Sequence, residues 1–582
     1  SAAKIFFNKT PLTLSIEESA TLVGMLKNSS LYNPIRRPDR VKVRRNIVFK
    51  QMLRNELISQ EEKDSLSQLP IKITYTPESH REGLATYFRA YLKEFMDNWI
   101  ADNPKPDGTK HSLYRDGLRI FTTIDSKMQA IGESAVDEHM KNLQKEFFKQ
   151  NTQKINPTAP FLELRKGEID TLMERTAYRT DRWRKMKLAG IKEAEILASF
   201  YQKTQMRIFT WNGERDTIMT PIDSIRYYKH FLRASLMSME PQSGHIKTWV
   251  GGFNYKHFQY DQVKQGRRQI GSTFKPFLYA TAIDQLKLSP CDSLPDALYC
   301  IEPMKHGNMN AWCPKNSGDK YGRTRTLKTA LANSINTVSA RIMDLVGPRP
   351  VINLARKMGI TSTLPAVPSI ALGTPDISLF EMVGAYSTFV NQGIYVKPVV
   401  ITRIEDKNGR ALYELVPETQ DVLSQEAAYV TVNLLQGVTK AGSGARLRHA
   451  GLEKTNYVYE NVITGYPYVF ENQIAGKTGT TQNQSDGWFM GMVPNLATGV
   501  WVGGEDRAIH FKEIAFGQGA TMALPIWAIY MKNLYKNPEF GISIEDFEVP
   551  ENLSIPIECQ ELNEDGDVVK SKPKADLDAL GF

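Results

Sequence analysis

Residues 270–280 read IGSTFKPFLYA and combine a serine, a lysine and a helical apolar pattern. Apolar residues from Phe274 to Leu286 recur at helical spacing, and a proline such as Pro276 is tolerated only in a first turn. We therefore predict a helix that begins near Ser272. Residues three apart share one face of a helix, so the Lys275 amine can reach back toward the Ser272 hydroxyl, where unpaired N–H groups favour negative charge. The stretch can place a nucleophile and its base on one turn.

Two further motifs accompany this pair. Ser334-Ile335-Asn336 lies between two helical patterns, and Lys477-Thr478-Gly479-Thr480 lies in a strand-like stretch. Each motif alone has an ordinary structural explanation, because serine and lysine are common at helix starts, Ser and Asn cap loops, and Lys with Gly suits an edge strand. Together, in this order, the three motifs are better explained as one site.

An acyl-transfer site needs a nucleophile, a base, an oxyanion hole and a group that holds the charge of the substrate. The sequence has no Gly-x-Ser-x-Gly motif and no histidine beside a candidate serine, so the base is not an imidazole. Lys275 fits this role, because apolar neighbours and a second cation, Lys477, disfavour its ammonium form. Ser334 would pass a proton to the leaving amine. On this interpretation Ser272, Lys275, Ser334 and Lys477 are catalytic.

The other motif residues are predicted to bind the substrate. The Asn336 amide can bond a peptide carbonyl, and Gly479 lets an extended peptide approach the strand. Thr478 and Thr480, with the lysine before them, can hold a terminal carboxylate. We expect the backbone N–H groups of Ser272 and Thr480 to form the oxyanion hole. The sequence contains no pattern for a metal or another cofactor.

Composition limits the class of protein further. The 582 residues leave room for about two to four domains, and 41% hydrophobic and 24% charged residues are ordinary for a globular chain. No run approaches the ~18 apolar residues of a membrane span. The net charge of +9 is mild and of mixed sign along the chain, and we expect no nucleic-acid partner. Four cysteines, at 291, 300, 313 and 559, lack zinc-ligand spacing, so buried thiols or one disulfide are the candidates.

Strand patterns occur in two separate sets. An antiparallel hairpin is predicted at 236–250 around Gln242-Ser243-Gly244, and three later strands are predicted at 474–480, 488–493 and 498–502. Helices are predicted between the two sets, at 327–332, 337–346, 380–391 and 425–438. Strands at both ends with helices between them predict an α+β domain over 235–545, built as an antiparallel sheet flanked by helices.

The remaining segments differ in character. Residues 1–70 are basic and helical. Residues 71–140 begin as a polar linker broken by Pro and Gly and end in a short strand and a helix capped by Asp125. Residues 141–234 are predicted to be a helical insertion of unknown role. Residues 546–582 are predicted to be a loose polar tail.

The three motifs, in this order, resemble those of active-site-serine β-lactamases and penicillin-binding proteins. Further stretches are similar to class A penicillin-binding proteins, among them Thr122-Thr123-Ile124-Asp125, Pro368–Gly373 and Asp486–Phe489. Residues 1–70 resemble the C-terminal end of the family-51 glycosyltransferase domain of that class. Ile335 lies where the Ser-Asp-Asn motif has an acid. This variation looks more like a penicillin-binding protein than a class A β-lactamase.

This resemblance implies a serine β-lactamase/transpeptidase-like fold and a D,D-transpeptidase activity. Ser272 would attack the D-Ala-D-Ala bond of a peptidoglycan stem peptide, and an amine of a neighbouring stem would take the acyl group. β-Lactams would mimic the donor and acylate Ser272. The implied partners are stem peptides, the lipid-linked precursor and other cell-wall synthesis proteins. The implied location is the bacterial periplasm, with an inner-membrane anchor upstream of this sequence.

The resemblance also carries expectations about the N-terminal segment and the cysteines. The acidic motif with the catalytic glutamate of the glycosyltransferase is expected upstream, so Glu17 and Glu18 are interpreted as first-turn acids of a helix. Glycan polymerisation is expected only of a longer protein. An oxidising periplasm predicts a Cys300–Cys313 disulfide. Two alternatives stay open: a hydrolase of the same fold, either D,D-carboxypeptidase or β-lactamase, and a non-enzymatic β-lactam sensor or cell-wall scaffold.

Overall fold

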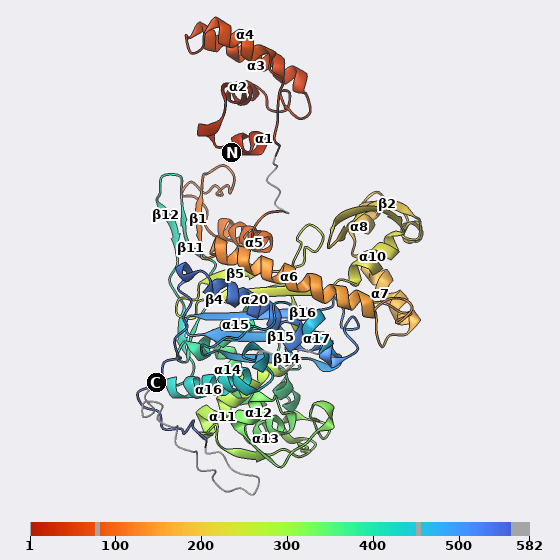
Figure 1. Ribbon diagram of the computed structural model, residues 1–582, viewed down its shortest axis with the longest axis vertical. Coiled ribbons are helices and arrows are strands. Elements are labelled where there is room, and N and C mark those ends of the chain that lie inside the picture. The colour runs from red at the N-terminus through yellow and green to blue at the C-terminus, as the bar shows by residue number, and fades with distance from the viewer. Residues whose placement is uncertain (1, 76–81, 450–455, 560–582) are drawn as a thin grey trace, which may run out of the picture. The chain divides into compact units, whose positions relative to one another are not determined.

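The computed structural model describes residues 2–75, 82–449 and 456–559 (Figure 1). The chain divides into two compact units, Ser1–Gly83 and Leu84–Phe582. Within the described residues, no helix is both long enough and apolar enough to cross a membrane.

The first unit is helical, as predicted for the N-terminal segment. Its helices are α1 (Ala2–Phe7), α2 (Ile16–Met25), α3 (Pro38–Arg54) and α4 (Gln60–Gln68). Ser15 caps α2, and its N–H donates to the Glu18 carboxylate at 2.8 Å. The prediction that Glu17 and Glu18 are first-turn acids is therefore confirmed. Acids are favoured there because the helix N-terminus is positive.

The second unit is built on a five-stranded sheet of order β14-β15-β16-β4-β5. Every neighbouring pair of strands is antiparallel. The early hairpin and the three late strands were predicted, and the pairing of β16 with β4 joins the two sets. Strand β14 lies at the open edge of this sheet. The five strands are β4 (Arg233–Met239), β5 (Ile246–Val250), β14 (Ala475–Thr480), β15 (Asp486–Val493) and β16 (Leu496–Gly503).

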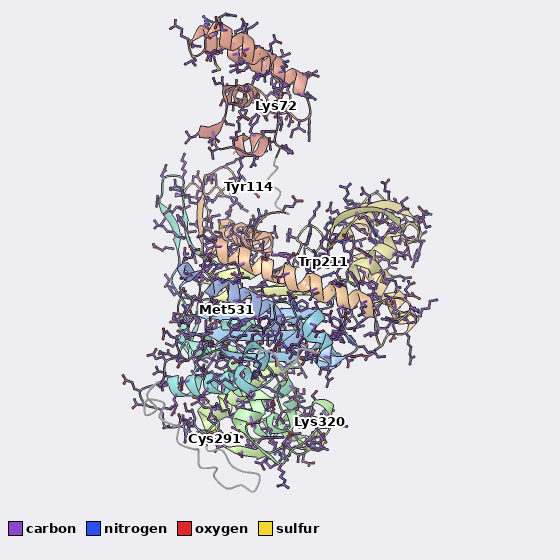
Figure 2. All side chains as sticks on the ribbon, in the orientation of Figure 1. Lys72, Tyr114, Trp211, Cys291, Lys320 and Met531 are labelled. Atoms are coloured by element: carbon purple, nitrogen blue, oxygen red, sulfur yellow. A yellow bond between two sulfur atoms is a disulfide. The ribbon has the colours of Figure 1, made fainter. Side chains whose placement is uncertain are left out.

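Helices cover both faces of the sheet (Figure 1), so its strands are apolar on both sides. Along β15, Phe489 belongs to the core shared with one helical layer and Met490 to the core shared with the other, as the alternation of a strand requires. One layer holds α6 (Ser126–Gln150) and α20 (Leu524–Tyr535), which carries Met531 (Figure 2). On the other face, α15 (Leu379–Val390) and α16 (Gln425–Ala441) pack on the sheet. Further from the sheet, α11 (Lys275–Leu286) and α12 (Leu327–Ala332) pack on α16, and α13 (Asn336–Val346) and α14 (Pro348–Lys357) pack on α11. This is the predicted α+β architecture.

One helix contradicts the interpretation of residues 71–116 as a polar linker. Helix α5 spans Thr86–Asp102, and it buries Phe88, Met96 and Trp99. Its Tyr91 ring stacks on Trp249 with centroids 4.8 Å apart. The signal was present in the sequence, because apolar residues recur at helical spacing from Tyr87 to Ile100. The Pro- and Gly-rich stretch that follows drew the interpretation toward a linker.

The insertion over 141–234 is also not wholly helical, which corrects the prediction. It contains α7 (Lys166–Tyr178), α8 (Asp181–Leu188), α9 (Glu193–Ser199) and α10 (Pro221–Lys229). Between these helices lies an antiparallel hairpin of β2 (Thr204–Thr210) and β3 (Gly213–Met219). The signal missed in the sequence is Asn212-Gly213 at the turn, because Asn-Gly is a strong hairpin dipeptide.

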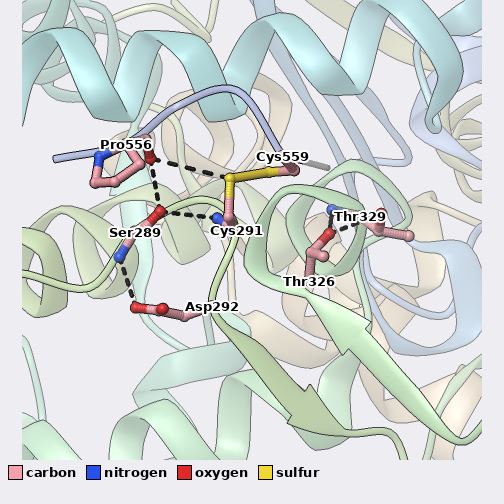
Figure 3. The surroundings of a disulfide bond; sticks show 7 residues. All are labelled: Ser289, Cys291, Asp292, Thr326, Thr329, Pro556 and Cys559. Carbon is pink, nitrogen blue, oxygen red and sulfur yellow. Dashed lines mark hydrogen bonds between the residues drawn. A yellow bond between two sulfur atoms is a disulfide. The ribbon is translucent and has the colours of Figure 1, made fainter. Parts of the chain in front are cut away.

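The first part of the predicted loose tail is fixed to the second unit, which corrects that prediction for residues 546–559. Phe547 and Ile555 are buried. The Ile555 N–H donates to the Glu426 carboxylate at 2.9 Å, and the Pro556 carbonyl accepts from the Ser289 hydroxyl at 2.6 Å (Figure 3). The rest of that predicted tail, residues 560–582, lies outside the described residues.

All four cysteines are paired. The predicted Cys300–Cys313 disulfide is confirmed, and a second bond joins Cys291 to Cys559, 268 residues further along (Figure 3). The alternative of buried free thiols is therefore wrong, and so is the expectation of a single disulfide. Sequence spacing could not indicate the second pair, because only the folded chain brings its two ends together.

We predict two native disulfides in the purified protein. Peptide mapping without reduction should recover Cys291 linked to Cys559 and Cys300 linked to Cys313, with no reactive thiol after unfolding without reductant. Replacing Cys291 and Cys559 together by serine should lower the free energy of unfolding by about 2–4 kcal/mol, because the unfolded chain loses a constraint. Free thiols or exchanged pairs in the unmodified protein would contradict this assignment.

Candidate active site

Ser272 lies on a short turn that leads into helix α11. A 3-10 turn over Gly271–Phe274 runs directly into α11, so the helix start predicted near Ser272 is confirmed. The neighbours on this turn are buried, and the Tyr386 hydroxyl donates to the Thr273 carbonyl at 2.6 Å. Ser272 itself is only half-buried. The turn is therefore anchored in the core while its serine remains accessible.

Lys275 is completely buried and surrounded by neutral acceptors. Its Nζ donates to the Ser334 carbonyl at 2.5 Å, to Asn336 Oδ1 at 2.7 Å and to Ser334 Oγ at 3.2 Å. Burial, and then the nearby charge of Lys477, hold the pKa of Lys275 well below its ordinary value. A neutral amine is a competent proton acceptor, which is the property predicted for the base.

Ser334 lies between the two lysines. It has a left-handed φ of +57° in the turn between α12 and α13. Its Oγ accepts from Lys275 at 3.2 Å and from Lys477 at 3.1 Å. Lys477 is also buried, and burial lowers its pKa to about 7. The hydroxyl therefore connects two buried amines whose pKa values both lie below the ordinary value.

The third motif lies on β14, at the sheet edge. Thr478 Oγ1 is 2.5 Å from Ser443 Oγ, and Thr480 Oγ1 accepts from the Gly519 N–H at 3.1 Å. A Cβ added to Gly479 would lie 2.8 Å from the Ile270 carbonyl. Glycine is thus required here because β14 packs closely against the segment that enters the Ser272 turn.

The two expected oxyanion-hole residues lie on these adjacent segments. A Cβ added to Gly271, whose φ is +55°, would lie 2.8 Å from the Thr480 carbonyl oxygen and 3.4 Å from the Thr480 nitrogen. The backbone of Thr480 is therefore next to the turn that carries Ser272. No side chain larger than hydrogen fits between the two segments without displacement.

Strand β15 fixes the segment before Ser272 from the other side. The Trp488 indole donates to the Gln269 carbonyl at 2.9 Å, and the Arg268 guanidinium pairs with the buried Asp486 at 2.7 Å. Asp486 also accepts from Trp501 at 3.0 Å. A buried carboxylate requires such partners. Here these hydrogen bonds hold the segment before Ser272 against the sheet.

The structure thus joins Lys275, Ser334, Asn336 and Lys477 by direct hydrogen bonds, and it places the turn that carries Ser272 beside Thr480 of β14. Sequence reasoning missed Ser443, which contacts Thr478. The available signal was the run Gly442-Ser443-Gly444 directly after α16. A Cβ on Gly442 would lie 2.2 Å from the Ala332 carbonyl, so the glycine marks a close approach. Among the described residues, no His, Cys, Asp and Glu cluster of three or more could hold a metal ion.

Comparison with known families agrees with this site. Residues 234–505 match the penicillin binding protein transpeptidase domain. Residues 156–232 match the penicillin-binding protein middle domain, and residues 1–53 match the transglycosylase family.

Two curated relatives and two solved structures extend the match. The chain is 30% identical to penicillin-binding protein 1A of Aquifex aeolicus, over 96% of this chain and 71% of the relative. It is 26% identical to penicillin-binding protein 1A of Neisseria meningitidis, over 93% of this chain and 66% of the relative. The crystal structure of penicillin-binding protein 1A from Haemophilus influenzae matches with a TM-score of 0.61 at 22% identity, covering 94% of this chain and 84% of that one. The solved structure of the penicillin-binding protein PonA1 from Mycobacterium tuberculosis matches with a TM-score of 0.52 at 19% identity, covering 84% of this chain and 100% of that one.

The fold and the matched domains define a penicillin-binding transpeptidase. The chain belongs to the class A penicillin-binding proteins. The predicted family and the predicted fold class are both confirmed.

The lowered pKa of Lys477 predicts a pH dependence of stability. Between about 7 in the folded protein and the ordinary value of about 10.4 in the unfolded chain, only the unfolded chain binds the proton. The free energy of unfolding should therefore rise with pH, by up to about 1.4 kcal/mol per pH unit. Lys275, whose pKa is also lowered, contributes a rise of the same sign. Lys477→Met should therefore reduce the slope measured by urea unfolding between about pH 7 and pH 9, by up to about 1.4 kcal/mol per pH unit.

A matched control is Lys320→Met, at an exposed lysine (Figure 2). This variant should keep the pH slope of the unmodified protein. Equal slopes in Lys477→Met and in the unmodified protein would show that Lys477 keeps its ordinary pKa after folding.

Proposed function

We propose that this chain is a serine-type D,D-transpeptidase that cross-links peptidoglycan stem peptides through an acyl-enzyme on Ser272. The observation that carries the proposal is the buried Lys275, whose pKa is held low one turn from an accessible serine. The transpeptidase domain match and the penicillin-binding protein relatives support the same reaction class.

In the first half of the proposed reaction, Lys275 takes the proton of the Ser272 hydroxyl, and Ser272 Oγ bonds to the carbonyl carbon of the D-Ala-D-Ala amide. The N–H groups of Ser272 and Thr480 stabilise the oxyanion. Ser334 Oγ, hydrogen-bonded to Lys275 and Lys477, gives its proton to the leaving nitrogen and takes the proton held by Lys275, which returns to the neutral amine. The C–N bond breaks and D-Ala leaves.

In the second half, an amine of a neighbouring stem peptide attacks the ester carbonyl. Its proton returns through Lys275, the ester C–O bond breaks, and Ser272 is regenerated. Lys477, Thr478 and Thr480 hold the donor carboxylate on the open edge strand, where an extended peptide can align, and the Asn336 amide binds a peptide carbonyl. β-Lactams acylate the same serine as donor mimics.

We also infer the setting of this reaction. Two disulfides support an oxidising compartment such as the bacterial periplasm. The proposed transpeptidase domain extends over 235–545, and its proposed partners are stem peptides, the lipid-linked precursor and other cell-wall synthesis proteins. We also propose that the protein is held at the inner membrane by an anchor.

Labelling with a fluorescent penicillin tests the nucleophile and the base. Ser272→Ala should abolish labelling, because no acyl ester can form. Lys275→Ala should slow acylation by about 10²–10⁴-fold, as expected for a lost general base. The matched control is Ser571→Ala, because Ser571-Lys572-Pro573-Lys574 repeats the Ser-x-x-Lys spacing outside the described residues. Labelling that survives in Ser272→Ala would refute the assignment.

The fate of the adduct separates a transpeptidase from a hydrolase of the same fold. Deacylation by water needs a base on the side opposite the leaving group, and the three motifs supply no carboxylate for it. We therefore expect the penicilloyl adduct to persist for hours in a chase with unlabelled penicillin. Rapid loss of label with catalytic turnover of penicillin would favour the β-lactamase alternative.

A further inference from the structure

Helix α13, which begins with Asn336, lacks a local cap. Its N-cap residue is Ile335, whose side chain cannot accept a hydrogen bond. The first N–H groups of a helix need acceptors from elsewhere when they are not solvated. Here Asn316 Oδ1 accepts from the Asn336 N–H at 2.9 Å and from the Thr337 N–H at 3.2 Å. A side chain from a separate loop therefore caps the helix that follows the active-site serine Ser334.

Asn316 is itself held in this position. Its Nδ2 donates to Asp296 Oδ1 at 2.7 Å and to the Lys320 carbonyl at 3.0 Å. Asp296 is 3% exposed, and the same Oδ1 accepts from the Thr337 hydroxyl at 2.8 Å. The Asn316 amide therefore has a defined orientation: its NH₂ group faces a buried carboxylate, and its oxygen faces the start of α13.

The same loop orients the side chain of Asn336. Asn336 Nδ2 donates to the Lys315 carbonyl at 2.8 Å, and Asn336 Oδ1 accepts from Lys275 Nζ at 2.7 Å. Because an amide presents its donor and acceptor on opposite sides, binding the donor side to Lys315 turns the acceptor toward the base. The disulfide of Cys313, two residues before Lys315, anchors this loop.

We propose that Asn316, held by Asp296, is a positioning residue for acylation. It fixes the start of α13, and through it the places of Ser334 and Asn336 around Lys275. Asn316 lies outside the three motifs and acts without touching the substrate. The inference rests on the proposed function, since the step that it serves is the acylation of Ser272.

The test uses the rate of Ser272 acylation by a fluorescent penicillin. Asn316→Leu removes the acceptor and the donor at similar volume, and we expect acylation to slow by about 10- to 100-fold, as small misplacements of catalytic groups do. Asn310→Leu, an exposed asparagine inside the Cys300–Cys313 loop, is the matched control and should acylate at the unmodified rate.

An exchange of the two side chains separates positioning from general destabilisation. Asn316→Asp alone places two carboxylates next to each other, and we expect this variant to be acylated slowly. Asn316→Asp combined with Asp296→Asn restores one donor facing one carboxylate and still offers an acceptor to α13. This double variant should be faster than Asn316→Asp and should recover part of the rate, because the Lys320 carbonyl, which accepts from Asn316 Nδ2 at 3.0 Å, then loses its donor. Amide hydrogen exchange at Asn336 and Thr337 should be faster in Asn316→Leu and should return toward the unmodified rate in the double variant.

The outcomes are distinguishable. If the unmodified protein acylates at Ser272 and Asn316→Leu acylates equally fast, the positioning role is wrong and the proposed function stands. The positioning role is also wrong if the double variant is no faster than Asn316→Asp alone. If the unmodified protein is not acylated at Ser272, the proposed function is wrong, and this inference falls with it.

Discussion

Two buried lysines share one hydroxyl, and this arrangement constrains the rest of the transpeptidase site. Lys275 and Lys477 both donate to Ser334 Oγ, at 3.2 Å and 3.1 Å. Burial removes both amines from water and lowers the pKa of each, to about 7 for Lys477. The nearby charge of Lys477 lowers the pKa of Lys275 further, so that a neutral amine becomes available. Burial is thus the source of the proposed base strength.

Holding this arrangement requires three distant segments to approach closely. The Ser272 turn, the α12–α13 turn and β14 meet because a two-faced sheet with helices on both sides provides rigid supports for all of them. Glycines lie where backbones nearly touch, at Gly271 against Thr480 and at Gly479 against Ile270. Such contacts tolerate no side chain, which explains why the site consists of short motifs with glycine at defined places.

Polar residues outside the motifs hold these segments in position. Asp486 binds Arg268 before the Ser272 turn, and Asp296 holds Asn316 at the start of α13. In each case a buried carboxylate accepts a hydrogen bond from a side chain of a neighbouring segment, and this bond holds that segment in place. Precise placement of a catalytic group depends on such supporting contacts as much as on the group itself.

Local sequence patterns were sufficient for the elements whose signals are local. Periodicity predicted the helices at 327–332 and 425–438 and the strands of the main sheet, and motif spacing predicted the residues that meet around Lys275. The Cys291–Cys559 bond and the Asn316 cap could not be predicted in this way. Each depends on a partner that no local pattern contains: a cysteine 268 residues away, and a helix start whose own cap residue is Ile335. Helix α5 differs from these two, because its helical spacing was present in the sequence and was missed, and only its packing on Trp249 needed the folded chain. A pattern of a few residues records which face of a helix or strand is apolar, but it does not record what that face contacts. That pairing arises only when the folded chain brings the two surfaces together.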